Sequence, residues 1–353
     1  MMLRELKRAT IGVGALLLGA VGPAAAQDVT YAVTTTNISV GHASQSSIPQ
    51  AMGYWKDEGL NVDVLGLSGA TAGIQQVAAK QVDFATVGPE ALLMAQAEGL
   101  PVKAVYTFAR LPIYRIVSLK DGGPTSAEEL AGKVVGVPNM STGSVPFARA
   151  VLKGAGIDPE TGVEWLAVGL GAQAANALKG GDVDVWASWD TAVASLENGG
   201  FEFNFIEPEW MDEMFGNVMI AHVDTIAEHP DWVAKVARGI AKSSVFGLAN
   251  PEATIRNHWK MYPQTAPAEQ SDEELAKAKH IFDSRFELLL PKEGEKWGEN
   301  MPVQWKRAVD LAAAENLIPA DTDPSAAYTN EFIDEINDFD PAAVEEDAKN
   351  SDW

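Results

Sequence analysis

Residues 62–87 read VDVLGLSGATAGIQQVAAKQVDFATV, and this stretch decides the fold class. The apolar run at 62–67 predicts a β-strand, the glycine-containing turn after it leads into a helix at 71–79, and the apolar run at 83–87 predicts a second strand. A strand, a helix and a parallel strand in succession are the unit of sheets that helices cover on both faces. The sequence therefore predicts an α/β protein.

The same alternation continues on both sides of this stretch. The segments KQVDFA (80–85) and KGGDVDVW (179–186) occupy the same place in two successive series, which predicts two lobes of similar construction. Long helices are expected beyond residue 207, followed by an acidic end that wraps the surface and frays. The other expected strands are residues 29–34, 102–108, 113–119, 133–137, 163–168 and 184–187, and the other expected helices of the two series are residues 46–58, 90–98, 144–154 and 172–179.

Composition excludes several classes of function. A formal net charge of −23 over 353 residues repels nucleic acid and anionic lipid, so neither is an expected partner. The chain has no cysteine, which excludes zinc–thiolate sites and thiol nucleophiles. The histidines show no metal-ligand spacing, and there is no phosphate-loop motif or Gly-x-Ser-x-Gly elbow. We therefore expect no metal, no cofactor and no catalysis.

The first 26 residues have the pattern of a signal peptide. Basic residues at Arg4, Lys7 and Arg8 precede an apolar run at 11–21, and small residues follow up to Ala26. The apolar run is too short to span a bilayer, which needs about 20 residues. We expect cleavage near Ala26, export to the periplasm, and no direct insertion of the mature chain into a membrane.

Polar loops follow the predicted strands. Ligands of open α/β sheets bind beyond the carboxyl ends of strands, and Gly, Ser and Thr at helix starts leave backbone N–H groups free for a ligand. Ordinary helix capping is the alternative explanation for the same residues. The candidate ligand-binding residues in these loops are Ser46, Ser47, Ser68, Gly69, Thr71, Pro89, Glu90, Ser141, Thr142 and Ser144.

Two tryptophans and an acid end the strand predicted at 184–187. We expect Trp189 and Asp190 to face the ligand, as a stacking surface and an acceptor, and Trp186 to be structural. Arg110, after another predicted strand, either clamps an anionic group or forms an ion pair at the lobe junction.

Several segments together resemble a known family. AMGYWKDEGLNV (51–62), VDFA (82–85), KVVGV (133–137) with STGS (141–144), and VDVW (183–186) with Trp189 and Asp190 are similar to the sulfonate/nitrate/taurine branch of ABC-transporter substrate-binding proteins. That branch also includes binders of pyrimidine precursors of thiamine. The resemblance implies a type II periplasmic binding fold, in which two α/β lobes close over a solute. It also implies a small-molecule solute and, as partner, an ABC permease with a cytoplasmic ATPase.

The resemblance also sets expectations for the domains and the ligand. We expect a discontinuous lobe 1 at 27–118 plus 209–353, a lobe 2 at 119–208, hinges near 118–122 and 207–217, and a monomer. In taurine-type sites a sulfonate cradle is paired with an acidic partner for the amine, a role that Asp190 could fill. Pro146 and Phe147 depart from the family pattern, which leaves a heteroaromatic ligand stacked on Trp189 open.

Two other functions remain as rivals. Pyrimidine-forming synthases are similar in sequence pattern, but they carry a cysteine-rich motif that this chain lacks. A receptor that serves signalling alone is the third possibility. The primary expectation is an exported receptor for a small polar or anionic organic solute of the sulfonate or taurine type.

Overall fold

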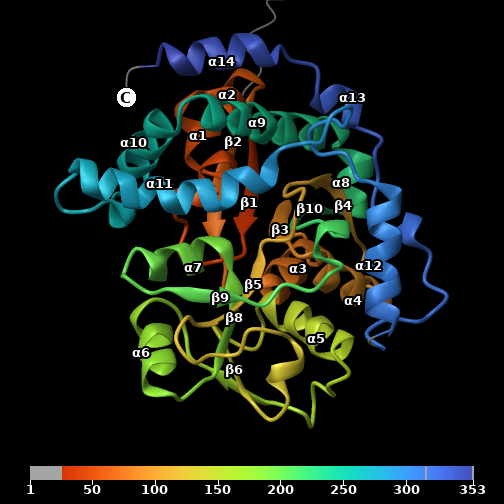
Figure 1. The fold of residues 1–353 in the computed structure, drawn as a ribbon. Coiled ribbons are helices and arrows are strands. Elements are labelled where there is room, and N and C mark those ends of the chain that lie inside the picture. Colours follow the sequence, from red (N-terminus) through yellow and green to blue (C-terminus); the bar gives the residue numbers. More distant parts are fainter. Residues whose placement is uncertain (1–25, 315, 352–353) are drawn as a thin grey trace, which may run out of the picture.

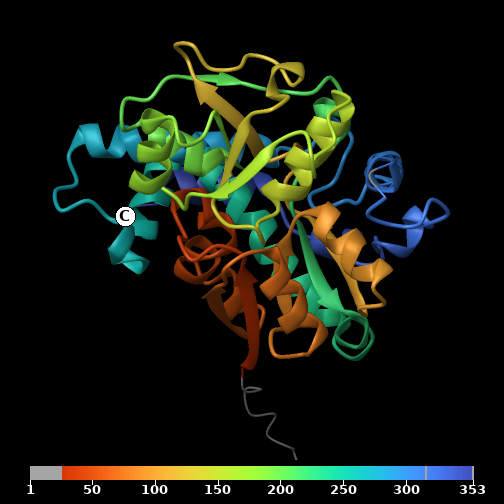
Figure 2. The ribbon, with the colours of Figure 1, turned by 90° about the horizontal axis from the view of Figure 1, so that it is seen from below.

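The computed structural model describes residues 26–314 and 316–351. The expected signal peptide lies outside these residues, apart from Ala26. The chain forms two mixed five-stranded sheets, and Figures 1 and 2 show them in two lobes, one above the other. Sheet 1 has the order β2 (Leu60–Gly66), β1 (Gln27–Val33), β3 (Phe84–Val87), β10 (Val218–His222) and β4 (Val102–Thr107). Sheet 2 has the order β7 (Glu164–Ala167), β6 (Val134–Val137), β8 (Val185–Trp189), β5 (Tyr114–Leu119) and β9 (Phe203–Phe205).

Helices cover both sheets, as the expected α/β class requires. The α-helices are α1 (Ser47–Ala51), α2 (Tyr54–Asp57), α3 (Ala70–Ala78), α4 (Pro89–Ala97), α5 (Ser144–Gly154), α6 (Ala172–Gly180), α7 (Asp190–Glu197), α8 (Val223–Glu228), α9 (Pro230–Ala249), α10 (Pro251–Met261), α11 (Asp272–Phe286), α12 (Pro302–Ala314), α13 (Ile333–Ile336) and α14 (Pro341–Lys349). Short 3-10 helices include η1 (Val40–Gln45), η2 (Glu128–Leu130), η3 (Met211–Glu213), η4 (Pro263–Thr265), η5 (Glu287–Leu289) and η6 (Pro324–Ala326). Within the described ranges, none of these helices has the length and apolar character needed to cross a membrane.

Each sheet contains antiparallel strands, which the local pattern did not predict. Strand β10 runs antiparallel to β3 and β4, and β5 runs antiparallel to β8 and β9. The chain crosses between the sheets at 108–113 and again at 206–217. The crossing segments are joined by backbone hydrogen bonds, from Ala109 N to Asn217 O at 3.0 Å and from Gly216 N to Ala109 O at 2.9 Å.

The second expected hinge at 207–217 coincides with a crossing, whereas the first expected hinge at 118–122 is wrong. Residues 118 and 119 already lie in β5 of sheet 2, where they pair with β9. The turn at 121–124 is rich in glycine and looked like a boundary, but it follows the crossing. The chain therefore leaves sheet 1 after Thr107.

The two similar sequence segments play the same structural part in both lobes. Asp83 precedes β3 and accepts a hydrogen bond from the backbone N–H of Thr30 in β1, at 2.7 Å. Asp184 precedes β8 and accepts one from the N–H of Val134 in β6, at 2.8 Å. In each lobe the carboxylate thus joins the start of a strand to its parallel neighbour, β1 beside β3 and β6 beside β8.

Two long segments differ from their expected form. The helix expected at 46–58 is divided into α1 and α2, with residues 40–45 forming η1, because Gly53 adopts a left-handed conformation with φ of 73°. The acidic end is better ordered than expected: α14 packs on α9 and buries Val344 and Ala348, and the chain is described to Ser351. Figure 1 shows α14 lying across the outer side of lobe 1.

Candidate ligand-binding site

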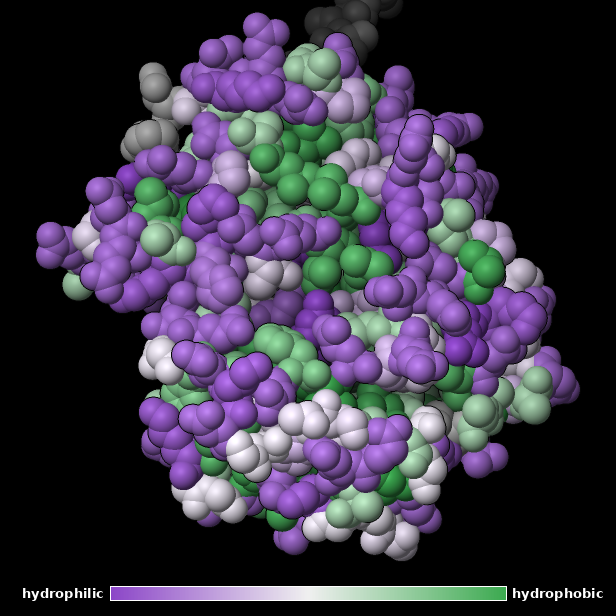
Figure 3. Space-filling model, in the orientation of Figure 1, coloured by the Kyte–Doolittle hydropathy of each residue, from purple (hydrophilic) through white to green (hydrophobic). Residues whose placement is uncertain are grey.

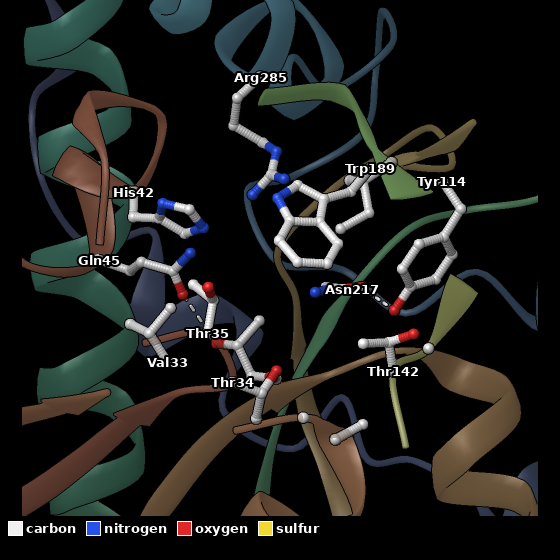
Figure 4. Close-up of a pocket in the computed structure, with 15 residues that line it drawn as sticks. Val33, Thr34, Thr35, His42, Gln45, Tyr114, Thr142, Trp189, Asn217 and Arg285 are labelled. Carbon is white, nitrogen blue, oxygen red and sulfur yellow. Dashed lines mark hydrogen bonds between the residues drawn. The ribbon is translucent and has the colours of Figure 1, made fainter. Parts of the chain in front are cut away.

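A cleft of about 470 Å³, part of it open to solvent, lies between the lobes. Figure 4 shows that side chains from both lobes converge on it. The lining residues are Val33, Thr34, Thr35, His42, Gln45, Gly69, Ala70, Thr86, Ile113, Tyr114, Thr142, Gly143, Trp189, Asn217 and Arg285.

Gln45 presents hydrogen-bond donors from the lobe 1 wall. Its Oε1 accepts from Tyr31 Oη at 2.6 Å and from Thr86 Oγ1 at 2.9 Å. Since both donors occupy the oxygen, the amide NH₂ is turned toward the cleft, as Figure 4 shows. Burial raises the pKa of Tyr31, so this phenol stays protonated and keeps the amide in place.

His42 supplies an uncharged ring beside Gln45. Burial, together with the charge of Arg285, holds the pKa of His42 well below its ordinary value, so the ring is neutral at physiological pH. Its Nδ1 lies 3.3 Å from Ser39 Oγ. This wall of the cleft therefore offers hydrogen bonds without a cationic charge.

Arg285 is buried and already paired. Its Nε donates to Asp190 Oδ2 at 2.6 Å and its Nη2 to Asp190 Oδ1 at 2.5 Å, and both side chains are only 2% exposed. Asp190 also accepts from the N–H of Thr191 at 2.7 Å. Arg285 is the only residue on the described lining of the cleft that carries a full charge at neutral pH, and the carboxylate of Asp190 balances it.

The lobe 2 wall is aromatic. Trp189 at the end of β8 and Tyr114 at the start of β5 are directly paired across adjacent strands, and both line the cleft. Tyr114 Oη donates to Asn217 Oδ1 at 3.4 Å, which leaves the amide NH₂ of Asn217 for a ligand. Stacking surfaces and neutral donors are therefore within reach of one small molecule.

Two helices begin at the cleft from opposite lobes. Helix α3 has no side-chain cap, so its first backbone N–H groups remain available. In α5 the N–H of Val145 donates to Thr142 O at 3.2 Å, and Pro146 has no N–H. The lobes also touch here: a Cβ on Gly69 would lie 2.8 Å from both Ser141 O and Ser141 Oγ. Gly69 has φ of 94°, a conformation that favours glycine.

Six of the expected site residues lie at or beside the cleft. Gly69, Thr142 and Trp189 line it directly. Ser68 lines a side opening together with Trp189. Thr71 and Ser141 face a neighbouring groove between α3 and α5.

The other expected residues are placed differently, and most have structural partners. Ser46 Oγ donates to His42 O at 2.8 Å, and Ser47 Oγ lies 2.9 Å from His258 Nδ1, so both hydroxyls are used inside lobe 1. Ser144 is buried beneath Thr142, with 2.9 Å between their hydroxyl oxygens. Pro89 occupies the first turn of α4 and does not line the cleft.

Three charged candidates also lie outside the cleft lining. Arg110 is 3% exposed and bonds Glu295 Oε2 at 2.6 Å and Glu299 O at 2.5 Å, so the structure shows the ion pair and not a ligand clamp. Asp190 was expected to face the ligand, but its carboxylate accepts hydrogen bonds from Arg285 and does not line the cleft. Glu90 Oε2 is shielded from solvent without a hydrogen-bond partner, and burial raises the pKa of Glu90 to about 7. Trp186 is fully buried, as expected for a structural residue.

Sequence reasoning missed much of the lining. Thr34, Thr35, His42 and Gln45 lie in the first polar loop, which the sequence did single out, but Ser46 and Ser47 were chosen from it. Thr86 and Tyr114 lie within strands, and Asn217 lies in a crossing segment. Arg285 lies in the last turn of α11, 95 residues after Asp190, where no local pattern marks it.

Comparisons with known proteins identify the family of the chain. The family model described as "NMT1/THI5 like" matches residues 47–254. Riboflavin-binding protein RibY of Chloroflexus aurantiacus is 25% identical over 293 residues, which cover 81% of this chain and 81% of that protein. The 4-amino-5-hydroxymethyl-2-methylpyrimidine phosphate synthase of Candida albicans is 24% identical and covers 80% of this chain and 81% of its own length.

A solved structure extends the comparison to the fold. The alkanesulfonate-binding protein SsuA of Xanthomonas axonopodis pv. citri, bound to MOPS, superposes with a TM-score of 0.66 at 15% identity, over 87% of this chain and 99% of that chain. At this identity the likeness concerns the fold alone, and it confirms the expected periplasmic binding fold with two lobes. Together with the family match, it confirms the expected resemblance: the chain belongs to the NMT1/THI5-like family and has the two-lobed fold of periplasmic binding proteins.

Proposed function

We propose that this chain is an exported receptor that binds a neutral, planar heteroaromatic solute and delivers it to an ABC importer. The solute carries several hydrogen-bond acceptors and stacks on Trp189. The mature protein acts in the periplasm as a monomer, without a cofactor and without changing its ligand. The lobes close over the solute about the two crossing segments, with lobe 1 comprising residues 27–107 and 218–353 and lobe 2 comprising residues 114–205.

The balanced charge of Arg285 is the observation that carries the choice of ligand class. Both guanidinium contacts to Asp190 are short and buried, so the cleft offers no unpaired cation to an anionic ligand. A neutral ligand needs no unpaired cation.

Neutral donors and aromatic rings support the same choice. The amide groups of Gln45 and Asn217 point donors into the cleft, which suits carbonyl oxygens and ring nitrogens. Trp189 gives a planar ring a stacking partner, worth about 0.5–1.5 kcal/mol beyond area burial. The names of the two curated relatives concern a flavin and a pyrimidine, both of which are planar heteroaromatic compounds.

A small sulfonate is the second candidate. The uncapped first turn of α3 favours it, because free N–H groups and the helix dipole attract oxyanions. Sulfonate oxygens are also good acceptors for Gln45 and Asn217. The two candidates differ in charge, and this difference makes them separable.

A calorimetric binding panel tests the proposal. Residues 27–353 are titrated with 4-amino-5-hydroxymethyl-2-methylpyrimidine, riboflavin, taurine and ethanesulfonate. We expect a pyrimidine or flavin to bind, and Trp189→Ala to weaken that binding at least about tenfold while Trp189→Phe retains most of it. Trp232→Ala, which removes a tryptophan of α9 that does not line the cleft, is the matched control. Tight binding of sulfonates alone would reject the heteroaromatic class.

Removing the negative charge of Asp190, which balances Arg285, separates the sulfonate and heteroaromatic ligand classes more clearly. In Asp190→Asn the amide cannot balance the guanidinium, so the cleft gains a net positive charge close to the ligand. We expect sulfonate affinity to rise at least about tenfold and heteroaromatic affinity to change little. If sulfonates already bind the unmodified protein and lose affinity in Asp190→Asn, the balanced pair is not what selects the ligand.

Delivery and the absence of catalysis are tested separately. Bound ligand is recovered after prolonged incubation and compared by mass spectrometry with the starting compound; we expect it to be unchanged. Uptake of the same labelled compound should require both this protein and an ABC permease. Conversion of the compound by the purified protein would favour the enzyme rival.

A further inference from the structure

A second space opens directly from the cleft. It lies between α3 and α4 of lobe 1 and α5 with the loop at 139–143 of lobe 2, and Figure 1 shows α5 beneath these two helices. We call it the tail groove and define it by Ile74, Ala91, Met94, Met140, Val145 and Pro146. Its space is about 970 Å³ against about 470 Å³ for the cleft.

The tail groove and the cleft share a wall. Ala70, Thr142 and Gly143 line both spaces, so a molecule in the cleft needs to pass only these small residues to enter the groove. Gly143 has no side chain, and the Thr142 hydroxyl is turned to Asn139 O at 3.0 Å and to Ser144 Oγ at 2.9 Å. An apolar ligand chain that passes between the cleft and the groove therefore leaves no hydroxyl of Thr142 without a partner.

The groove differs from the cleft in chemistry. Most of its lining is apolar, with Thr71, Gln75, Glu98, Ser141, Thr142 and Arg149 as the polar members. Two of the apolar residues are methionines, whose flexible thioethers adapt to chains of different shape. Met140 is 53% exposed and forms part of the groove from the lobe 2 loop. Arg149 also borders the groove, but it is paired with Glu160 and lies 5.8 Å from the centre of the Trp165 ring.

Pro146 lines the groove from the first turn of α5. A proline here has no backbone donor and adds apolar surface, so this side of the groove is less polar.

We propose that the tail groove binds an apolar tail of the same solute whose polar head occupies the cleft. The inference rests on the proposed function for the head and adds the class of substituent: an unbranched, uncharged chain of several carbons attached to the ring. Each lobe contributes one side of the groove, so the tail is enclosed only when the lobes close. A bound tail therefore stabilises the closed form of the protein and increases the affinity for the solute.

A homologous series of ligands tests this inference. The probes are 4-amino-2-methylpyrimidines whose 5-substituent lengthens from methyl to heptyl, titrated into residues 27–353. We expect the dissociation constant to fall about two- to fourfold per methylene until the groove is filled. Ala91→Trp, which fills the groove, should abolish this gain and leave the methyl compound unaffected. Ala97→Trp, at an exposed position at the end of the same helix, is the matched control.

A second variant tests the groove independently, in case Ala91→Trp does not fold. Met140→Asp places a charge in the groove from an exposed loop position and should weaken the heptyl compound about tenfold or more, whereas Leu166→Asp at another exposed position of lobe 2 should not. A dissociation constant that does not depend on chain length, or a gain that survives both groove variants, overturns the inference.

The series also separates the two proposals. If the methyl compound binds and longer chains bring no gain, the head class stands and the tail groove fails. If only long members bind, and Ala91→Trp abolishes that binding, the groove is supported and the heteroaromatic head is not. Binding by no member overturns both.

Discussion

At the residue scale, Glu90 is a carboxylic acid whose protonation depends on folding. Its Oε2 is shielded from water and has no hydrogen-bond partner, and burial raises its pKa to about 7. A Cβ added to Gly88 would lie 2.8 Å from the Tyr114 hydroxyl and 3.2 Å from Glu90 Oε2, so the acid lies beside the aromatic wall of the cleft. The folded protein therefore binds a proton that the unfolded chain releases at lower pH.

The stability of the protein should depend on this proton. Because the folded pKa lies above the unfolded value near 4.5, the burial penalty is absent below about pH 4.5, grows as pH rises, and is complete above about pH 7. We expect Glu90→Gln to match the unmodified protein at pH 4 and to exceed its free energy of unfolding at pH 8 by at most about 3 kcal/mol. Denaturant unfolding at both pH values measures this difference. Glu98→Gln at an exposed site is the control, and equal pH slopes in both variants would refute the assignment.

The pair of Arg285 and Asp190 allows a different residue-scale prediction. Removing one member leaves a buried charge unbalanced, so Asp190→Ala should lower the free energy of unfolding by about 3–5 kcal/mol. Replacing both, as in Asp190→Leu with Arg285→Met, should cost clearly less, since no charge remains buried. Thermal and urea unfolding of the three proteins form the comparison. A double variant that is less stable than Asp190→Ala would contradict this account.

At the scale of elements, the start of α3 meets the loop at 139–143 of the other lobe. Gly69→Ala should both strain the backbone, by about 1–3 kcal/mol at this φ, and hold the lobes apart, because the new Cβ meets Ser141. We expect weaker ligand binding and a larger radius of gyration of the ligand-bound form by small-angle X-ray scattering.

Gly99 offers a matched control for the element-scale prediction. It has φ of 85° but no neighbour within 4 Å of an added Cβ, so Gly99→Ala introduces strain without the lobe contact. Gly99→Ala should lose stability and keep its affinity. Equal losses of affinity in both variants would show that the contact at Ser141 plays no part in closure.

Local sequence patterns predicted many elements well and failed where other segments intervene. Helix α5 begins and ends at the expected residues 144 and 154, because one apolar face and a polar turn define it locally. Strands β9 and β10 and helix α7 were not predicted. The pairing of β10 with β3 and β4 depends on a return from the other lobe, which no short window of sequence contains.

At the scale of the whole molecule, the net charge of −23 repels itself in the folded state. Figure 3 shows one face of the molecule, where hydrophilic residues cover much of the outer surface. Salt shortens the Debye length from about 30 Å at 0.01 M to about 8 Å at 0.15 M, so repulsion between exposed carboxylates weakens. We expect Tm to rise by about 2–4 °C between 0.01 and 0.15 M NaCl, measured by calorimetry. A Tm that falls with salt would mean that exposed ion pairs outweigh the net repulsion.

The sequence by itself determined the α/β alternation, the similar construction of the two lobes and the loops from which Gly69, Thr142 and Trp189 reach the cleft. These features follow from periodicity and turn chemistry, which act within a few residues. Only the tertiary structure decided that Arg285 and Asp190 balance each other, that Arg110 is used elsewhere, and that the crossing precedes residue 114. The physical reason is that packing of distant segments selects charge partners and strand neighbours, and that selection leaves no local pattern in the chain.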